Sequence, residues 1–123
     1  MANYLQLKKD YNNTKSLIKK ILSNKDTQSK LTSDGTRLLT YLIDKTHSKL
    51  TSYPIIDNPL FSHIYFNNSL LQKDLKLTDQ QVQNSIKKLQ SYNLINIHTI
   101  KGGYTQISSK FFTLNFKNFK FII

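Results

Sequence analysis

The sequence predicts an α+β fold, in which several helices are combined with a small sheet. Apolar residues recur at helical spacing in several stretches, and shorter runs between them alternate apolar with polar residues. A Gly-Gly pair separates two of these shorter runs, as in a hairpin. A chain of 123 residues is large enough for one hydrophobic core but not for two.

The first predicted helix, Tyr4 to Ser23, is amphipathic and basic. Its apolar residues lie roughly on one side and are Tyr4, Leu7, Tyr11, Ile18 and Leu22. Its lysines lie elsewhere and are Lys8, Lys9, Lys15, Lys19 and Lys20. The polar stretch Asn24 to Lys30 is typical of a linker, so we divide the chain into an N-terminal element, residues 1–30, and a main domain, residues 31–123. This helix either dimerises with a second copy or covers its own core.

The main domain opens on a helix and a short strand. The segment Leu31-Thr-Ser-Asp34 is a capping signal ahead of a helix that runs to about Lys49. That helix buries one face, formed by Leu38, Leu39, Leu42, Ile43 and Leu50. Thr51 to Pro59 is predicted to be a loop because it holds two prolines. Phe61, Ile64 and Phe66 then supply a strand that can pair with a later hairpin.

A pair of helices follows, Ser69 to Leu75 and Thr78 to Tyr92, joined by a tight turn. The Thr78 hydroxyl can cap the second helix, and Gln81 completes a capping box with it. Val82, Ile86 and Leu89 form an apolar stripe that should pack on the shorter helix. The start and the inner face of the second helix are therefore well specified.

A hairpin and an apolar end complete the chain. Ile95, Ile97 and Ile100 lead to Lys101-Gly102-Gly103-Tyr104, where the glycines favour a two-residue turn, and Thr105 to Ser109 can return. Phe111 to Ile123 is too apolar for a disordered tail. We expect it to form one or two further strands that extend the sheet or contribute to a dimer contact.

The resulting order, helix, strand, helix, helix, strand, strand, is that of a winged helix-turn-helix with an extra N-terminal helix and a C-terminal strand extension. Asn and Gln can pair with an adenine edge, and Lys can neutralise phosphate or reach guanine. The candidate DNA-reading residues of the second helix of the pair are Thr78, Gln80, Gln81, Gln83, Asn84, Lys87, Lys88 and Ser91. The candidate wing residues are Lys101, Gly102, Gly103 and Tyr104, and the candidate DNA-backbone contacts are Asn68, Ser69 and Lys73. A polar outer face is equally typical of ordinary solvated helix surface.

Charge favours a polyanionic partner. The chain has 18 basic and 7 acidic residues, a net charge of +11, and no acid after Asp79. The same charge could serve RNA or a membrane surface. No segment approaches the roughly 20 apolar residues of a membrane span, and the first residues lack the apolar core of a signal peptide, so we expect no membrane partner.

The residue types argue against an enzyme. The chain has no Cys and no Glu, its Asp residues are scattered, and His47, His63 and His98 are isolated in the sequence. This leaves no paired carboxylate for acid/base chemistry and no spacing typical of a metal site, so we expect no cofactor and no metal. The absence of Cys is compatible with a reducing cytoplasm.

The segments Leu31 to Lys45, Ile64-Tyr-Phe66, the helix pair and Lys88 to Ile95 resemble the N-terminal winged-helix domain of plasmid and phage replication initiators of the RepA N-terminal type. The resemblance covers about Leu31 to Tyr104. It implies sequence-specific binding of dimers to repeated origin sites, with the helix from Thr78 in the major groove. Partition adaptors, relaxosome accessory proteins and small repressors share the pattern.

We therefore expect a DNA-associated homodimer that binds double-stranded DNA. The richness in Lys, Asn and Ile is typical of the codon usage of an AT-rich genome, so we expect the DNA site to be AT-rich as well. Other replication, partition or transfer proteins are further expected partners. The alternative is a winged helix used for protein contact within a nucleoprotein assembly.

Overall fold

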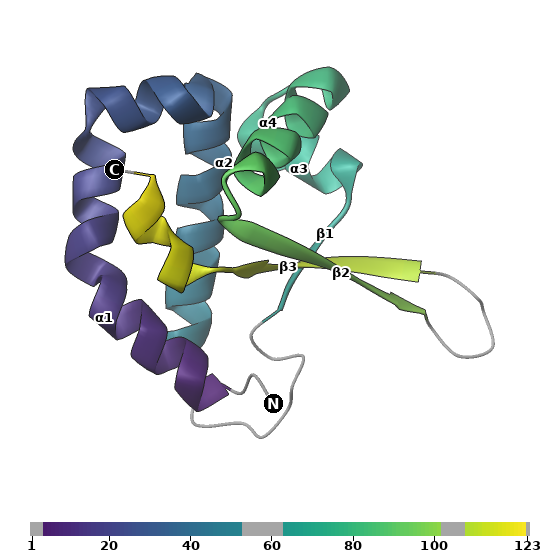
Figure 1. Ribbon diagram of the computed structural model, residues 1–123. Coiled ribbons are helices and arrows are strands. Elements are labelled where there is room, and N and C mark those ends of the chain that lie inside the picture. Colours follow the sequence, from purple (N-terminus) through teal and green to yellow (C-terminus); the bar gives the residue numbers. More distant parts are fainter. Residues whose placement is uncertain (1–3, 53–62, 102–107, 123) are drawn as a thin grey trace.

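The computed structural model describes residues 4–52, 63–101 and 108–122, which form a mixed α+β fold (Figure 1). The elements in chain order are α1 (Tyr4–Ser23), α2 (Lys25–Ser52), β1 (Ile64–Phe66), α3 (Asn68–Leu75), α4 (Asp79–Ser91), β2 (Ile95–Lys101), β3 (Ser108–Leu114) and the 3-10 helix η1 (Phe116–Phe121). The predicted order of helices and strands is confirmed from α1 to β3. The loop predicted from Thr51 to Pro59 is wrong for Thr51 and Ser52, which are the last residues of α2. Residues 53–59 and Phe61 lie outside the described residues.

The strands form one antiparallel sheet in the order β1-β3-β2. Phe112 occupies its centre, paired with Ile64 on one side and with Ile97 on the other. Phe112 is fully buried and stacks on Phe66 with ring centroids 3.7 Å apart. The predicted pairing of the first strand with the hairpin is thus confirmed, and it buries one face of the sheet against α2 and α4.

The two-residue turn predicted at Gly102-Gly103 is wrong. It would pair Lys101 with Tyr104, whereas the observed register pairs Lys101 with Ser108. The observed register sets Leu114 opposite Ile95, a position that the shorter turn would give to Lys110. Burial of apolar side chains therefore decided the register over local turn preference. Gly102, Gly103 and Tyr104 themselves lie outside the described residues.

The predicted linker is also wrong, because Lys25 to Lys30 is helical. The Asn24 side chain accepts a hydrogen bond from the Thr27 amide at 3.0 Å and caps this helix, and Thr27 and Leu31 are buried one turn apart. At Thr32, φ 68° and ψ 166° break the helix, and the Thr32 hydroxyl accepts the Gly35 amide. The capping signal expected at Leu31 to Asp34 therefore starts the second part of α2.

α1 has the predicted bounds and packs against α2 and η1. Its buried residues Tyr11, Ile18 and Ile21 belong to the same core cluster as the buried residues of the other elements. The Tyr11 hydroxyl lies 2.5 Å from His47 Nδ1 on α2. Of the two roles considered for this helix, covering its own core is the one observed for its apolar face.

The predicted C-terminal strand extension is wrong after Leu114. Phe111 to Leu114 belongs to the central strand β3, and Phe116–Phe121 forms η1, which packs on α1. Phe116, Phe119 and Ile122 are buried at intervals of three residues, while Phe121 is 71% exposed. A 3-10 helix has three residues per turn, so this spacing places the buried residues on one side.

We predict that Phe119→Ala lowers the free energy of unfolding by about 3–5 kcal/mol, because it removes a fully buried ring. Phe121→Ala is the matched control in the same short helix and should change it by less than about 0.5 kcal/mol. Urea unfolding followed by circular dichroism measures both. Equal losses would contradict the packing of η1 on α1.

Candidate nucleic-acid interface

Helix α4 has one face in the core and one in solvent. Val82, Ser85 and Leu89 are buried against α2 and α3. The Ser85 hydroxyl is satisfied by the Gln81 carbonyl at 2.7 Å, so a polar residue fits within this apolar face. The predicted apolar stripe is confirmed for Val82 and Leu89, and Ile86 is half-buried. The stripe packs against α2 as well as against α3, the partner that the sequence predicted.

Most of the predicted DNA-reading residues lie on the outer face of α4. Gln80, Asn84, Lys87 and Ser91 are exposed, and Gln83 and Lys88 are half-buried. The Gln80 side-chain amide donates to Asn84 Oδ1 at 2.9 Å, one turn away. The outer face therefore presents two linked carboxamides together with the exposed Lys87 and the half-buried Lys88.

Thr78 and Gln81 have a structural role. The Thr78 hydroxyl accepts the Gln81 amide at 3.2 Å, and Gln81 Oε1 accepts the Thr78 amide at 2.9 Å. This is the predicted capping box, and it is confirmed. Both side chains are exposed but are engaged with the backbone, which makes them poor candidates for reading bases.

Asp79 draws several of the predicted residues together. Its carboxylate accepts the side-chain amides of Asn68 at 3.0 Å and Gln83 at 2.7 Å, and lies 3.4 Å from that of Gln72. A predicted backbone contact from α3 and a predicted base contact from α4 thus meet at the start of α4. Asp79 was not among the predicted site residues, although an acid in the first helical turn is a known signal of a helix start.

The turn between α3 and α4 is fixed to α2. Lys76 adopts the left-handed conformation, with φ 55°, and Leu77 inserts its side chain into the core. The guanidinium of Arg37, the single arginine of the chain, donates to the Leu75 carbonyl at the end of α3. The Tyr41 hydroxyl donates to Asp74 at 2.8 Å. Burial, with the hydrogen bond to Asp74 and its charge, raises the pKa of Tyr41 to about 12.

The end of α4 is fixed to the hairpin. Asn93 is left-handed, with φ 56°, its amide donates to Gln90 O, and the Leu94 amide donates to Leu89 O. The Asn93 carbonyl in turn accepts the side chains of Asn115 at 3.1 Å and Asn118 at 2.9 Å. The direction in which the hairpin leaves α4 is thus set by amides from the segment after β3.

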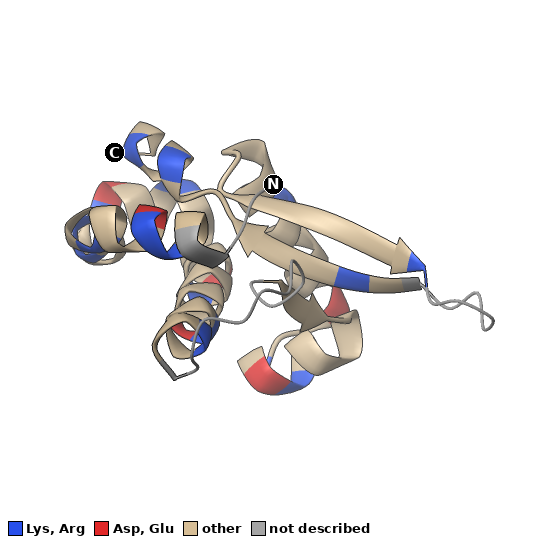
Figure 2. Ribbon diagram, turned by 90° about the horizontal axis from the view of Figure 1, so that it is seen from below, with Lys and Arg blue, Asp and Glu red and all other residues tan. Residues whose placement is uncertain are grey.

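The other predicted contacts lie at the edges of this surface. Ser69 and Lys73 are exposed on α3, and Lys101 is exposed at the end of β2. Lys101 and Lys110 give the far end of the hairpin its positive charge (Figure 2). The other three predicted wing residues cannot be added to this surface, because they lie outside the described residues.

No family model, curated protein or solved structure matches the chain. In residues 4–52, 63–101 and 108–122, no group of three or more His, Cys, Asp or Glu side chains lies close enough together to hold a metal ion. Within the same ranges, every helix is too short or too polar to cross a bilayer.

We predict that Thr78→Ala lowers the free energy of unfolding by about 1 kcal/mol, because it removes the capping side chain of α4. Thr78→Ser keeps the hydroxyl and should retain most of the stability. Thermal or urea unfolding of the three proteins measures the difference. A serine variant as unstable as the alanine variant would show that the hydroxyl does not act as a cap.

Proposed function

We propose that this chain is a winged helix-turn-helix protein that binds double-stranded DNA in a sequence-specific way. In this proposal α3 and α4 are the helix-turn-helix, α4 enters the major groove, and β2 and β3 form the wing. The sheet order β1-β3-β2, with the helix pair between β1 and β2 in the chain, is compatible with that fold.

The observation that carries the proposal is the division of α4 into a buried apolar face and an outer face of amides and lysines. A carboxamide can donate to and accept from an adenine edge at the same time. Gln80 holds Asn84 by a hydrogen bond, which restricts the Asn84 side chain before any DNA is bound. An ordered reading group loses less conformational entropy on binding.

Positive charge supports a duplex partner. The net charge is +11, and Lys73, Lys87 and Lys101 are exposed on α3, α4 and β2. Lysines that contact phosphate release counterions, so affinity should fall steeply as salt rises. Asn68 and Ser69 at the start of α3 would add neutral contacts to the DNA backbone.

The proposed biological role follows the resemblance to replication initiators: binding of a homodimer to repeated or palindromic, AT-rich sites in replication or its control, in the cytoplasm. Two copies would present their α4 helices to major grooves roughly 34 Å apart. A role in plasmid partition, in DNA transfer or in repression of transcription would use the same contact between α4 and DNA. The competing proposal is that the winged helix binds another protein in a nucleoprotein assembly.

Selection from a random duplex library near physiological salt tests the proposal. We expect a repeated or palindromic motif whose spacing identifies the class of site, and anisotropy should show tighter binding than to a scrambled duplex. Equal, salt-sensitive binding to both would reject sequence reading and favour protein contact.

We predict that Asn84→Ala weakens binding to the selected site by about 1–3 kcal/mol and relaxes the preference for one base pair, because it removes a paired donor and acceptor. Asn13→Ala, an exposed asparagine on α1, is the control and should leave the affinity unchanged. A uniform loss on every duplex would show that Asn84 does not read bases.

We predict that Lys101→Ala weakens binding to all duplexes alike and lowers the slope of log K against log salt by about one. Lys19→Ala removes an exposed charge from α1 and should leave the slope unchanged. Titrations at several salt concentrations measure both. If the two variants behave alike, the hairpin makes no phosphate contact of its own.

A further inference from the structure

Thr32 and Thr78 each cap a helix, and they differ in one backbone angle. Thr78 caps α4 with φ −74° and ψ 164°, and its hydroxyl accepts the Gln81 amide at 3.2 Å. Thr32 caps the second part of α2 with ψ 166°, and its hydroxyl accepts the Gly35 amide, also at 3.2 Å. The φ of Thr32, however, is 68°. Thr32 thus matches Thr78 in ψ and in its capping bond and departs from it in the sign of φ.

This value of φ is unfavourable for threonine. With φ 68° and ψ 166°, Thr32 lies in a region that glycine adopts readily and that a residue branched at Cβ does not. The Thr32 side chain is exposed, so its own burial does not hold it there. A strained angle of this kind persists when the surrounding structure imposes it. Here the imposing structure is the chain before Thr32, which folds back over the core.

Residues 4–31, called here the N-terminal arm, are the part that the angle folds back. Figure 1 shows α1 antiparallel to the second part of α2, with the short helical piece before Thr32 joining the two. The arm contributes four apolar residues to the buried core, namely Tyr11, Ile18, Ile21 and Leu31. An undocked arm would expose this apolar face to water, which is unfavourable.

The contacts that dock the arm are made to residues on the other side of the kink. The Tyr11 hydroxyl lies 2.5 Å from His47 Nδ1, and the Tyr11 and Phe116 rings lie 5.4 Å apart. Lys30 donates to the Ile122 carbonyl at 3.2 Å. Contacts of this kind are the same whether the arm and the core belong to one chain or to two. A second copy of the chain therefore offers the arm a surface that already fits it.

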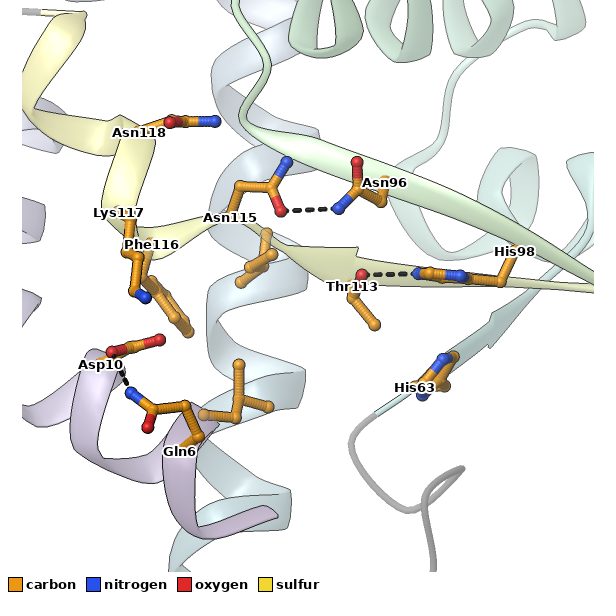
Figure 3. A pocket seen from close by; sticks show the side chains of 12 residues that line it. Gln6, Asp10, His63, Asn96, His98, Thr113, Asn115, Phe116, Lys117 and Asn118 are labelled. Carbon is orange, nitrogen blue, oxygen red and sulfur yellow. Dashed lines mark hydrogen bonds between the residues drawn. The ribbon is translucent and has the colours of Figure 1, made fainter. Parts of the chain in front are cut away.

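The interface of the arm is not closed along its whole length. A polar pocket of about 470 Å³ lies between the first turns of α1, the sheet and the segment after β3 (Figure 3). On the α1 side of this pocket, Gln6 donates to Asp10 of the same helix at 2.9 Å. His63 and His98 line the opposite side. An element with few buried apolar contacts over part of its length opens at a lower free energy than one buried throughout.

We propose that Thr32 is the hinge of a domain-swapped dimer, in which the N-terminal arm of each copy docks on the core of the other. Rotation of the Thr32 φ from 68° to a value like the −74° of Thr78 keeps the cap of α2 and swings the arm away from its own core. In the dimer each arm makes the contacts that it makes in the monomer, and both hinges are relaxed. This inference names how the homodimer of the proposed function forms, and it is tested without DNA.

Substitutions at Thr32 separate the angle from the cap. Thr32→Gly relieves the unfavourable φ and removes the hydroxyl, whereas Thr32→Ala removes the hydroxyl but keeps Cβ and with it the unfavourable φ. We expect Thr32→Gly to raise the dissociation constant of the dimer roughly tenfold or more, because two strained hinges per dimer are involved. Thr32→Ala is the matched control and should dimerise like the wild type. Sedimentation equilibrium of the full chain measures all three, and equal dissociation constants or a wild type that stays monomeric would overturn the proposal.

A crosslink shows which chain supplies the arm. The chain has no cysteine, and Lys15 of α1 and His47 of α2 line one groove, so Lys15→Cys combined with His47→Cys places two thiols there. A short bismaleimide added to the purified dimer should join two chains and give a covalent dimer on a denaturing gel. Each single-cysteine variant is a control and should give none. The same cysteine pair with Thr32→Gly should give crosslinks within one chain.

Crosslinks within one chain in the purified dimer would show that the two copies meet elsewhere. That result would overturn the swap and leave the homodimer of the proposed function in place. Loss of duplex binding by α4 variants is a separate measurement, so failure of the DNA proposal leaves this test unchanged.

Discussion

The pairing of Phe112 in the central strand is the constraint on which the rest of the structure depends. Phe112 joins Ile64, which precedes the helix pair, to Ile97, which follows it. The segment from α3 to α4 is thereby closed into a loop whose two ends are fixed on one sheet. Burial of the Phe112 and Phe66 rings, stacked 3.7 Å apart, stabilises that closure.

The same register determines what the protein presents to solvent. Side chains alternate between the two faces of a strand, so burial of Phe112 forces Phe111 outward, opposite Tyr65 and His98. It also fixes where β3 ends, and therefore where Asn115 meets the carbonyl of Asn93 after α4. A slip by one residue would bury Phe111, expose Phe112 and release the end of α4 from the hairpin.

Local signals in the sequence were sufficient for α1, α3, α4 and the second part of α2. The capping box of Thr78 and Gln81 involves residues three apart, and the buried face of α4 repeats with the period of a helix, so both could be predicted. The linker prediction failed because the polar stretch Asn24 to Lys30 contains one buried residue, Thr27, one turn before the buried Leu31. The period of three in Phe116, Phe119 and Ile122 was present in the sequence, but aromatic richness favoured a strand.

Pairings between distant residues were not predictable in the same way. Asp79 could be seen to start a helix, but its contact with Asn68 depends on the angle between α3 and α4. His63 and His98 are isolated in the sequence and meet only because β1 and β2 both pair with β3. The turn preference of two glycines, worth little in free energy, was outweighed by the burial of Leu114 beside Ile95.

The sheet also separates the outer face of α4 from the outward face of its own strands. The outer face of α4 depends on Val82 and Leu89, which pack among the helices, while Tyr65 and Phe111 alternate with the core positions of β1 and β3. Replacing an outward ring leaves its inward neighbour in place, so the helix pair keeps its support. One small core can therefore support a helix with a polar outer face and, independently, the outward side chains of the sheet.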